Sequence, residues 1–326
     1  MNKNLGKRLL AEGGVVIAIV IAFVFFSIMA PRAFLSFDNV INILKSISIT
    51  TVIAMGATIG FAAGIFDLSF ASLATLGAAL SCTFIAWYNM PMPIAMIATI
   101  LVCMLVELVN SVLVVKFQVT AFLATLAMSF VVDGLVLTYS GGSLINPRMA
   151  SASGQEVVRE IPQAFWNMGK SPYIIIIMFL CILVVELFLT YTKHGRLLYM
   201  VGSNAGAARL SGVKIGMYTT MAFMLTAVFS SLAGMLIAAR AGTVQSTAGS
   251  SFLMPAIAAA NIGFSFGGRG KANAIGTFVG AALIGVVENG LYAMAFPYYS
   301  INIIKGIILI LALVLSTLSA KAQENN

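Results

Sequence analysis

The sequence predicts an all-α integral membrane protein, with about ten transmembrane helices in a single domain that covers residues 1–326. Of the 326 residues, 60% are hydrophobic and only 9% are charged, whereas a soluble globular domain carries about 25% charged residues. Long apolar runs recur along the whole chain, and a spanning helix needs roughly 20 apolar residues. These observations exclude a soluble enzyme.

Each expected span is an apolar run between polar or helix-breaking residues. The first follows Lys3, Lys7 and Arg8 and is followed directly by Pro31, without the small residues of a signal-peptide cleavage site, so we expect it to stay in the membrane. The eighth is short and rich in small residues, and it either crosses the membrane or forms a re-entrant segment covered by protein. The ten expected spans are 13–30, 41–63, 69–88, 93–115, 121–139, 173–191, 217–239, 252–266, 274–294 and 301–319.

The basic residues predict the orientation. Ten crossings place both termini on one side, and basic residues concentrate in cytoplasmic loops. The side that holds both termini receives Lys3, Lys7, Arg8, Lys116, Lys193, Arg196, Arg209, Lys214, Arg269, Lys271 and Lys321. The other side receives Arg32, Lys45, Arg148, Arg159, Lys170 and Arg240. We therefore expect a multi-pass protein of the bacterial cytoplasmic (inner) membrane with both termini in the cytoplasm.

Two polar stretches divide the domain. N-terminal helices occupy 13–139, an extracytoplasmic loop 140–172, the sixth helix 173–191, a cytoplasmic loop 192–216 and C-terminal helices 217–326.

The sequence also contains a weak internal similarity. Segment 105–127 can be aligned with 284–306, which pairs Asn110 with Asn289. This is either an internal repeat of the kind common in transporters or a chance similarity of two apolar helices. Gly56, Gly60 and Gly64 recur at every fourth residue, which favours close helix packing.

Several classes of site are not expected. The net charge of +8 does not indicate nucleic-acid binding, because no basic patch is interleaved with aromatic residues. Cys82, Cys103 and Cys181 lie in apolar runs and are expected to be buried hydrophobic residues. A disulfide framework or a metal site is not expected, since His194 is the only histidine and no Cys-x-x-Cys pair exists.

The most informative pattern is HGRLLYMVGSNAGAARLSGVKIGMY, from His194 to Tyr218. Ala205 to Leu210 favour a short helix, which Asn204 can cap and Gly212 can end. The pattern resembles the signature loop of ribose-type (monosaccharide) permeases of ATP-binding-cassette importers. The matching residues are Gly195, Arg196, Tyr199, Gly202, Asn204, Ala207, Ala208, Arg209, Leu210, Ser211 and Gly212. The resemblance implies a coupling helix on which an ATPase subunit pushes; the alternative is an ordinary basic loop.

Three further motifs extend the resemblance over most of the chain. The stretch from Gly64 to Ser72 keeps Asp67, Leu68, Ser69 and Ser72 of a family motif, whereas Ile65 and Ala71 replace glycines. Gly267–Gly270 match the family's GGRG, with Lys271 in place of a serine, and Lys305-Gly306 match the end of its VKG. The resemblance implies a permease architecture similar to that of type II importers.

Ionisable residues inside expected spans are the remaining signal, because such charges usually face a cavity or a partner. They are Glu107, Asp133, Glu186, Glu288 and Lys305. Glu288 either pairs with Lys305 or lines a solute path with Asn289 and Asn110, where these side chains would hydrogen-bond sugar hydroxyls. Asp67 and Ser69 complete the candidate path. No role is assigned to Glu107 or Glu186.

The sequence therefore predicts the permease subunit of an ATP-driven importer that moves a monosaccharide or sugar-like solute into the cytoplasm. We do not expect an enzyme: Gly267–Lys271 lacks the P-loop spacing, so ATP and Mg²⁺ are expected on a partner ATPase. The resemblance also implies an extracytoplasmic solute-binding protein and a second permease copy or paralogue in the lipid bilayer.

Three alternatives stay open. One is an ion-coupled secondary transporter that uses Asp133 and Glu288 as coupling carboxylates. Another is a channel-like or structural subunit with passive flux. The third is a related importer permease for nucleosides, branched-chain amino acids or a sugar-derived signal.

Overall fold

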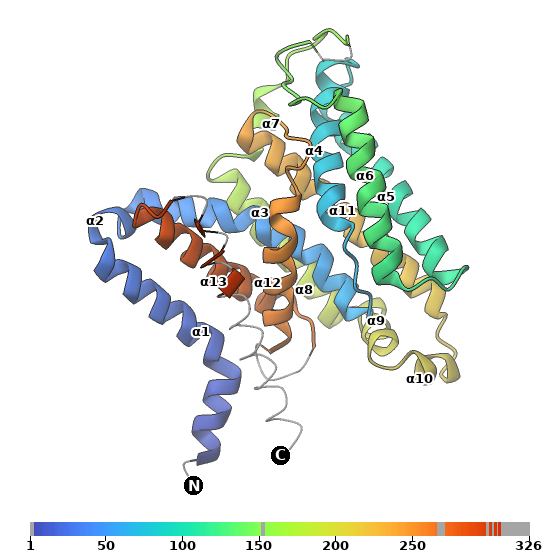
Figure 1. Cartoon of the computed structure of the whole chain (residues 1–326). Coiled ribbons are helices and arrows are strands. Elements are labelled where there is room, and N and C mark those ends of the chain that lie inside the picture. Colours follow the sequence, from blue (N-terminus) through green and yellow to red (C-terminus); the bar gives the residue numbers. More distant parts are fainter. Residues whose placement is uncertain are drawn as a thin grey trace.

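The chain is predominantly helical. In the computed structural model, residues 3–150, 154–265, 271–297, 300–301, 303–304 and 306–307 are described. The helices in order are α1 (Lys3–Met29), α2 (Pro31–Phe34), α3 (Phe37–Ala62), α4 (Phe70–Ala86), α5 (Met92–Val115), α6 (Ala121–Ser140), α7 (Gln163–Met168), α8 (Tyr173–Tyr191), α9 (Lys193–Ser203), α10 (Ala205–Leu210), α11 (Ile215–Ala241), the 3₁₀ helix η1 (Ser250–Phe252), α12 (Leu253–Ser265) and α13 (Ala274–Ala293) (Figure 1). The expected helical fold is confirmed.

Six described helices are long and apolar enough to cross a membrane: α3, α5, α6, α8, α11 and α13. Three shorter apolar helical stretches, Val15–Met29, Phe70–Ala86 and Ser250–Phe264, overlap the expected first, third and eighth spans. Most of the expected tenth span, 301–319, lies outside the described residues. The total of about ten spans and the type II-like architecture therefore stay predictions.

Helix α4 is almost completely enclosed and packs mainly against α11. All of its residues except Phe84 are buried, and many are Ala, Gly or Ser, which let neighbouring helices approach closely. A Cβ on Gly77 would lie 2.9 Å from the Cα of Ser231 in α11, and one on Gly234 would lie 2.2 Å from the Ala74 carbonyl oxygen. Two α4–α11 contacts thus require glycine.

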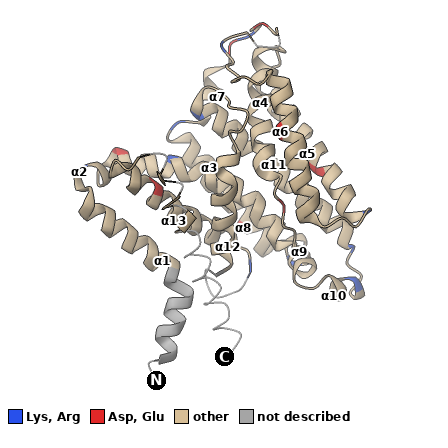
Figure 2. Cartoon of the chain, viewed as in Figure 1, with Lys and Arg blue, Asp and Glu red and all other residues tan. Residues whose placement is uncertain are grey.

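The outer helices differ from this core. Only 22% of the apolar windows of α5 and α6 is buried, against 61% in α3 and 72% in α11. Exposed leucines, isoleucines and phenylalanines cover α5, α6 and α8, which is the arrangement expected for surfaces that face lipid. The three cysteines are buried, as expected, and are free thiols. Charged residues are sparse on the helix bodies (Figure 2).

The two polar stretches lie at opposite ends of the molecule. In Figure 1, α7 and the segment after α6 are at the upper end, whereas α9 and α10 are at the lower end, where α1 also begins. An antiparallel bridge between Ile145 and Val244, with both N···O distances 2.9 Å, ties the upper segment to the segment that follows α11. Phe165 of α7 is fully buried and belongs to the same hydrophobic cluster as Ile145 and Val244.

Candidate functional site

Helix α10 is built as the sequence predicts. The Asn204 side chain accepts a hydrogen bond from the Ala207 N–H at 2.9 Å and caps the first turn. At the other end Gly212 has φ +77°, and the N–H of Val213 donates to the Ala208 carbonyl at 3.0 Å. This left-handed glycine closes the helix, so a six-residue helix forms between two turns of chain.

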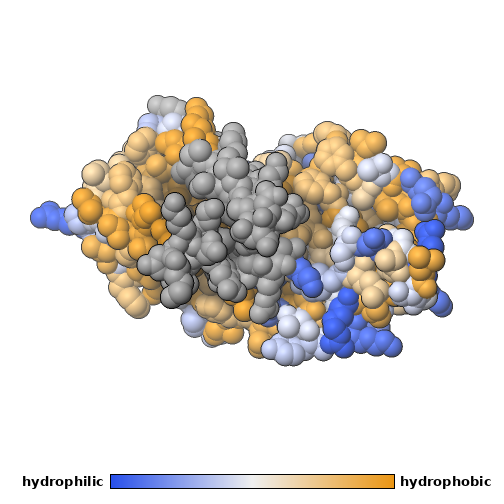
Figure 3. All heavy atoms as spheres, turned by 90° about the horizontal axis from the view of Figure 1, so that it is seen from below, coloured by the Kyte–Doolittle hydropathy of each residue, from blue (hydrophilic) through white to orange (hydrophobic). Residues whose placement is uncertain are grey.

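Helix α10 is presented outward. Ala208 is its one buried residue, whereas the Leu210 side chain is 92% exposed, and Arg209, Ser211 and Gly212 are exposed as well. Seen from below, hydrophilic residues gather at the right-hand side of the molecule, where α10 lies in Figure 1 (Figure 3). Single exposed leucines are common on protein surfaces, so this exposure shows that α10 is accessible to another protein.

Helix α9 holds α10 against the membrane domain. Thr192 caps α9 by accepting from the Gly195 N–H at 3.0 Å, and Leu198 and Val201 are buried. The Tyr199 hydroxyl donates to the Ala272 carbonyl. Burial, and then the charge of Glu186, raise the pKa of Tyr199 to about 12, so this hydroxyl keeps its hydrogen and its bond at neutral pH. Helix α9 is thereby a fixed arm rather than a loose loop.

Asp67, Ser69 and Asn110 meet in one buried polar cluster, and Glu107 joins them. Ser69 donates to Asp67 Oδ1 through its N–H at 2.7 Å and its hydroxyl at 2.6 Å. Its Oγ also lies 2.9 Å from Glu107 Oε1. The Asn110 amide donates to Ser69 Oγ and to Glu107 Oε2, both at 3.0 Å. Asp67 is 3% exposed and the other three are fully buried.

The buried cluster has fewer polar hydrogens than it has close oxygen–oxygen contacts if both carboxyl groups are ionised. Ser69 has one hydroxyl hydrogen, and its Oγ is within hydrogen-bond distance of both Asp67 Oδ1 and Glu107 Oε1. One carboxyl must therefore supply a hydrogen. Asp67 Oδ2 and Asn110 Oδ1 are buried acceptors without a partner among the described residues. These two acceptors can bind a ligand's hydroxyl groups only in an arrangement that opens the cluster, because all four residues are buried here.

The other two candidate path residues lie on α13, outside this cluster. Asn289 Oδ1 accepts from the Asn39 amide at 2.9 Å, and the same amide donates to the Phe34 carbonyl at 2.9 Å. Glu288 is half-buried and interacts electrostatically with Arg240 of α11. Lys305, the alternative partner of Glu288, lies outside the described residues. The structure thus brings three of the five predicted path residues together.

Two glutamates without an assigned role have clear contacts. Glu107 precedes Asn110 by three residues, so both lie on one face of α5. This spacing could have predicted that Glu107 lies beside Asn110. Glu186 Oε2 accepts from the backbone N–H groups of Ala274 at 3.1 Å and Ile275 at 3.4 Å. A carboxylate at this helix N-terminus stabilises α13, and only the tertiary fold places it there. Asp133 is half-buried on α6, near the Ser72 side chain of α4.

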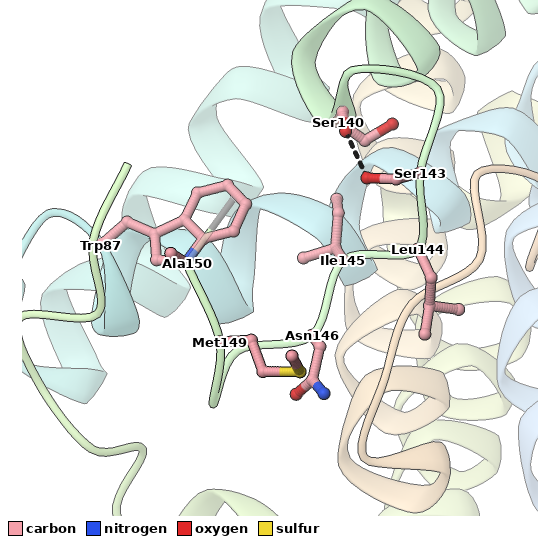
Figure 4. A pocket seen from close by; sticks show the side chains of 8 residues that line it. All are labelled: Trp87, Ser140, Ser143, Leu144, Ile145, Asn146, Met149 and Ala150. Carbon is pink, nitrogen blue, oxygen red and sulfur yellow. Dashed lines mark hydrogen bonds between the residues drawn. The ribbon is translucent and has the colours of Figure 1, made fainter. Parts of the chain in front are cut away.

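A pocket of about 320 Å³ lies at the end of the molecule opposite α10. Trp87, Ser140 and six residues of segment 143–150 line it (Figure 4). Sequence reasoning did not single out any of them. Among the described residues, no group of three or more His, Cys, Asp or Glu side chains is arranged to hold a metal ion.

Comparison with known proteins decides the family. Residues 39–313 match the family described as branched-chain amino acid transport system / permease component. The chain belongs to this permease family. The permease is 29% identical over 312 residues to the ribose import permease protein RbsC of Escherichia coli (strain K12), and the alignment covers 94% of each chain. It is 31% identical over 289 residues to RbsC of Bacillus subtilis (strain 168), covering 89% of the permease and 87% of the relative.

A further relative carries a different substrate in its name. The permease is 29% identical over 281 residues to the autoinducer 2 import system permease protein LsrD of Escherichia coli O9:H4 (strain HS), covering 84% of the permease and 82% of the relative. No solved structure matches the chain. The expected resemblance to ribose-type importer permeases is confirmed, and the permease is a membrane transport protein of the ATP-binding-cassette class. The matched residues include the Asp67 cluster and α10; Gly267–Gly270 lie outside the described residues.

Proposed function

We propose that this permease moves a monosaccharide or sugar-like solute across the bacterial inner membrane into the cytoplasm, driven by ATP that a partner subunit hydrolyses. The family and the named relatives support a sugar importer permease. ATP and Mg²⁺ belong to the partner ATPase. A second permease copy or paralogue completes the path, and a solute-binding protein delivers solute to the face that carries 140–172. Both termini lie in the cytoplasm.

The observation that carries this proposal is the exposure of α10. Helix α10 is capped at both ends, held by a packed α9, and presents Leu210 at 92% exposure. The partner ATPase docks on Ala207 to Gly212, with Gly195, Arg196 and Asn204 fixing the segment's shape. When the ATPase subunits close on ATP, the two coupling segments move together, and the path opens to alternate sides of the membrane.

The path residues fall into two groups. Asp67, Ser69 and Asn110 form the first, with two buried acceptors that a sugar hydroxyl satisfies as it passes. Glu288 and Asn289 on α13 form the second. Binding by these groups is weak, because a tightly held solute would not be released; the affinity resides in the solute-binding protein. In the resting arrangement the first group is closed, since its members are buried.

The test is co-purification followed by uptake. Tagged permease is purified from native membranes. Right-side-out membrane vesicles, with and without ATP in their lumen, are assayed for uptake of D-ribose and of autoinducer 2. We expect an ATP-binding subunit in the purified complex, and uptake that needs ATP and persists with a protonophore. Purification without an ATPase, together with uptake on an ion gradient, would replace the proposal by a secondary transporter in which Asp133 or Glu288 couples the ion. ATP-dependent uptake of nucleosides or branched-chain amino acids instead would keep the class and change the substrate.

A further inference from the structure

The pocket at the end opposite α10 is formed by three elements that the sequence keeps apart. Trp87 ends α4, Ser140 ends α6, and segment 143–150 crosses between them (Figure 4). The Ile145–Val244 bridge fixes the crossing segment to the chain after α11. Ser140 Oγ also lies 3.4 Å from Ser246 Oγ in that same segment. The Ile145–Val244 bridge and the Ser140–Ser246 contact therefore fix the shape of the pocket.

Trp87 is an unpaired donor in its wall. Its side chain is only 6% exposed, and its indole Nε1 has no hydrogen-bond acceptor among the described residues. Indole nitrogen is a donor only, and a buried donor without an acceptor is destabilising. In Figure 4 the ring reaches from the end of α4 toward Ile145. Because Nε1 itself is buried, the part of Trp87 that a ligand in the pocket contacts is the ring.

The remaining wall favours an uncharged ligand with hydroxyl groups. None of the eight lining residues is charged. The Ser143 hydroxyl donates to the Ser140 carbonyl at 2.8 Å, and the Ser140 hydroxyl contacts the Leu137 carbonyl at 3.1 Å. The Ser143 hydroxyl oxygen keeps lone-pair capacity for a donor from the ligand, whereas the Ser140 side chain is buried and lies against Ser246. Ile145 and the Trp87 ring supply apolar surface.

We infer that this pocket is an outer binding site for an uncharged polyhydroxyl solute of monosaccharide size, held by the ring of Trp87 and by the polar side chains of Ser143 and Asn146. The inference rests on the proposed function, which it extends with a second solute site. A sugar has both apolar C–H faces and hydroxyl donors and acceptors, which match this wall. The volume of about 320 Å³ is at the lower end of the range for small-molecule sites. The site receives solute before it enters the path.

Fluorescence offers a direct test, because the chain has two tryptophans. In the Trp166→Phe variant, Trp87 is the one remaining tryptophan and reports on the pocket. Purified variant in lipid nanodiscs is titrated with D-ribose, D-xylose, D-galactose and, as a small polyol, glycerol. We expect a saturable change in emission with at least one monosaccharide. The matched Trp87→Phe variant, which keeps Trp166 in α7, shows no change.

A second substitution separates contact from folding. Ser143→Ala in the Trp166→Phe background removes one hydroxyl, and we expect about a threefold or greater rise in half-saturation with unchanged emission of the free protein. No saturable change with any of the sugars would overturn the site. An emission change on adding the solute-binding protein alone, without response to free sugar, would also overturn it and make the pocket a protein-docking surface. Either negative result, combined with normal ATP-driven uptake by the parent permease, leaves the proposed function intact.

Discussion

The backbone of Gly202 in α9 lies directly against the backbone of Gly64, in the turn that follows α3. A Cβ on Gly202 would lie 2.7 Å from the Gly64 nitrogen and 2.3 Å from the Ala62 carbonyl oxygen. Gly64 has φ +73°, and a Cβ there would lie 3.1 Å from the Gly202 Cα. Gly202 precedes α10 by three residues, and Gly64 precedes Asp67 by three. The contact therefore joins the proposed ATPase-docking segment to the buried polar cluster.

Gly202→Ala is expected to separate ATP hydrolysis from transport. The added methyl group has no room, and overpacking of this kind costs about 1–3 kcal/mol, so the α9 arm shifts away from the 63–69 turn. We expect the assembled complex to keep its ATPase activity while uptake falls about tenfold or more. Gly206→Ala in α10 is the matched control, because its Cβ would meet only Asn204 Oδ1, at 3.3 Å. Equal uptake in the two variants would show that the contact transmits nothing.

Substitution of Leu210 tests the docking surface without disturbing the fold. Leu210→Asp is expected to abolish recovery of the ATPase subunit and ATP-driven uptake, whereas Leu210→Met keeps both. Because the side chain is 92% exposed, the melting temperature of the permease alone should hardly change; exposed substitutions cost about 0.5 kcal/mol or less. Arg209 and Gly212 variants should uncouple in the same direction. Normal uptake by Leu210→Asp would remove the docking assignment.

The hydrogen count in the buried cluster makes Glu107 informative. A Gln at this position can donate to Ser69 Oγ and accept from Asn110, as a hydrogen-bearing Glu107 does. We expect Glu107→Gln to keep the melting temperature of the permease, and Glu107→Leu to destabilise it by about 1–3 kcal/mol, since Asn110 loses a buried acceptor. Thermal unfolding in detergent measures both. A Glu107→Gln protein as unstable as Glu107→Leu would mean that the cluster needs a charged glutamate.

Glu288 distinguishes a path residue from a structural one. If it lines the path, Glu288→Gln lowers uptake about fivefold or more at unchanged melting temperature, and Asn289→Ala, which also loses the Asn39 contact, lowers both. We expect this result. A loss of thermal stability in Glu288→Gln with normal uptake per folded molecule would instead make Glu288 a structural partner of Arg240.

Orientation has its own measurement. The three native cysteines are buried, so a cysteine introduced as Gln155→Cys reports without large background. We expect an impermeant thiol reagent to label it from outside intact cells, because the proposed topology places 140–172 on the extracytoplasmic face. Ser211→Cys beside α10 is the matched position and should react only after lysis. The reverse pattern would invert the proposed topology.

Local features of this protein could be predicted from the sequence, and tertiary ones mostly could not. Asn204 and Gly212 bound α10 as expected, because capping depends on residues a few positions apart. Asp67 and Ser69 were identified from the family motif and Asn110 as a candidate path residue, but no pattern predicted their contacts. Glu107 was assigned no role, although its spacing from Asn110 on α5 indicates a shared face. The contacts of Glu186 with α13 and of Asn289 with Asn39 join distant segments, and no local pattern encodes them.

Helix α4 and the outer pocket show the same limit. The run 69–88 was expected as a span like the others, yet α4 is enclosed on nearly every side because its small residues admit α11. Trp87 was not singled out, because a single aromatic residue at the end of an apolar run has no distinctive spacing. The pocket arises only when the ends of α4 and α6 and segment 143–150 meet.

Site-specific photo-crosslinking at Leu210 tests the central proposal most directly. A photo-crosslinking amino acid is placed at Leu210 and, as the matched position, at Val158, which is 62% exposed at the other end of the molecule. Irradiation of native membranes should join the Leu210 variant to a subunit with a P-loop sequence and ATPase activity, more strongly when ATP is bound, and the Val158 variant should give no such product. An ATPase absent from the Leu210 product, or captured equally at Val158, would contradict the assignment of α10 as the site where ATP hydrolysis acts on this permease.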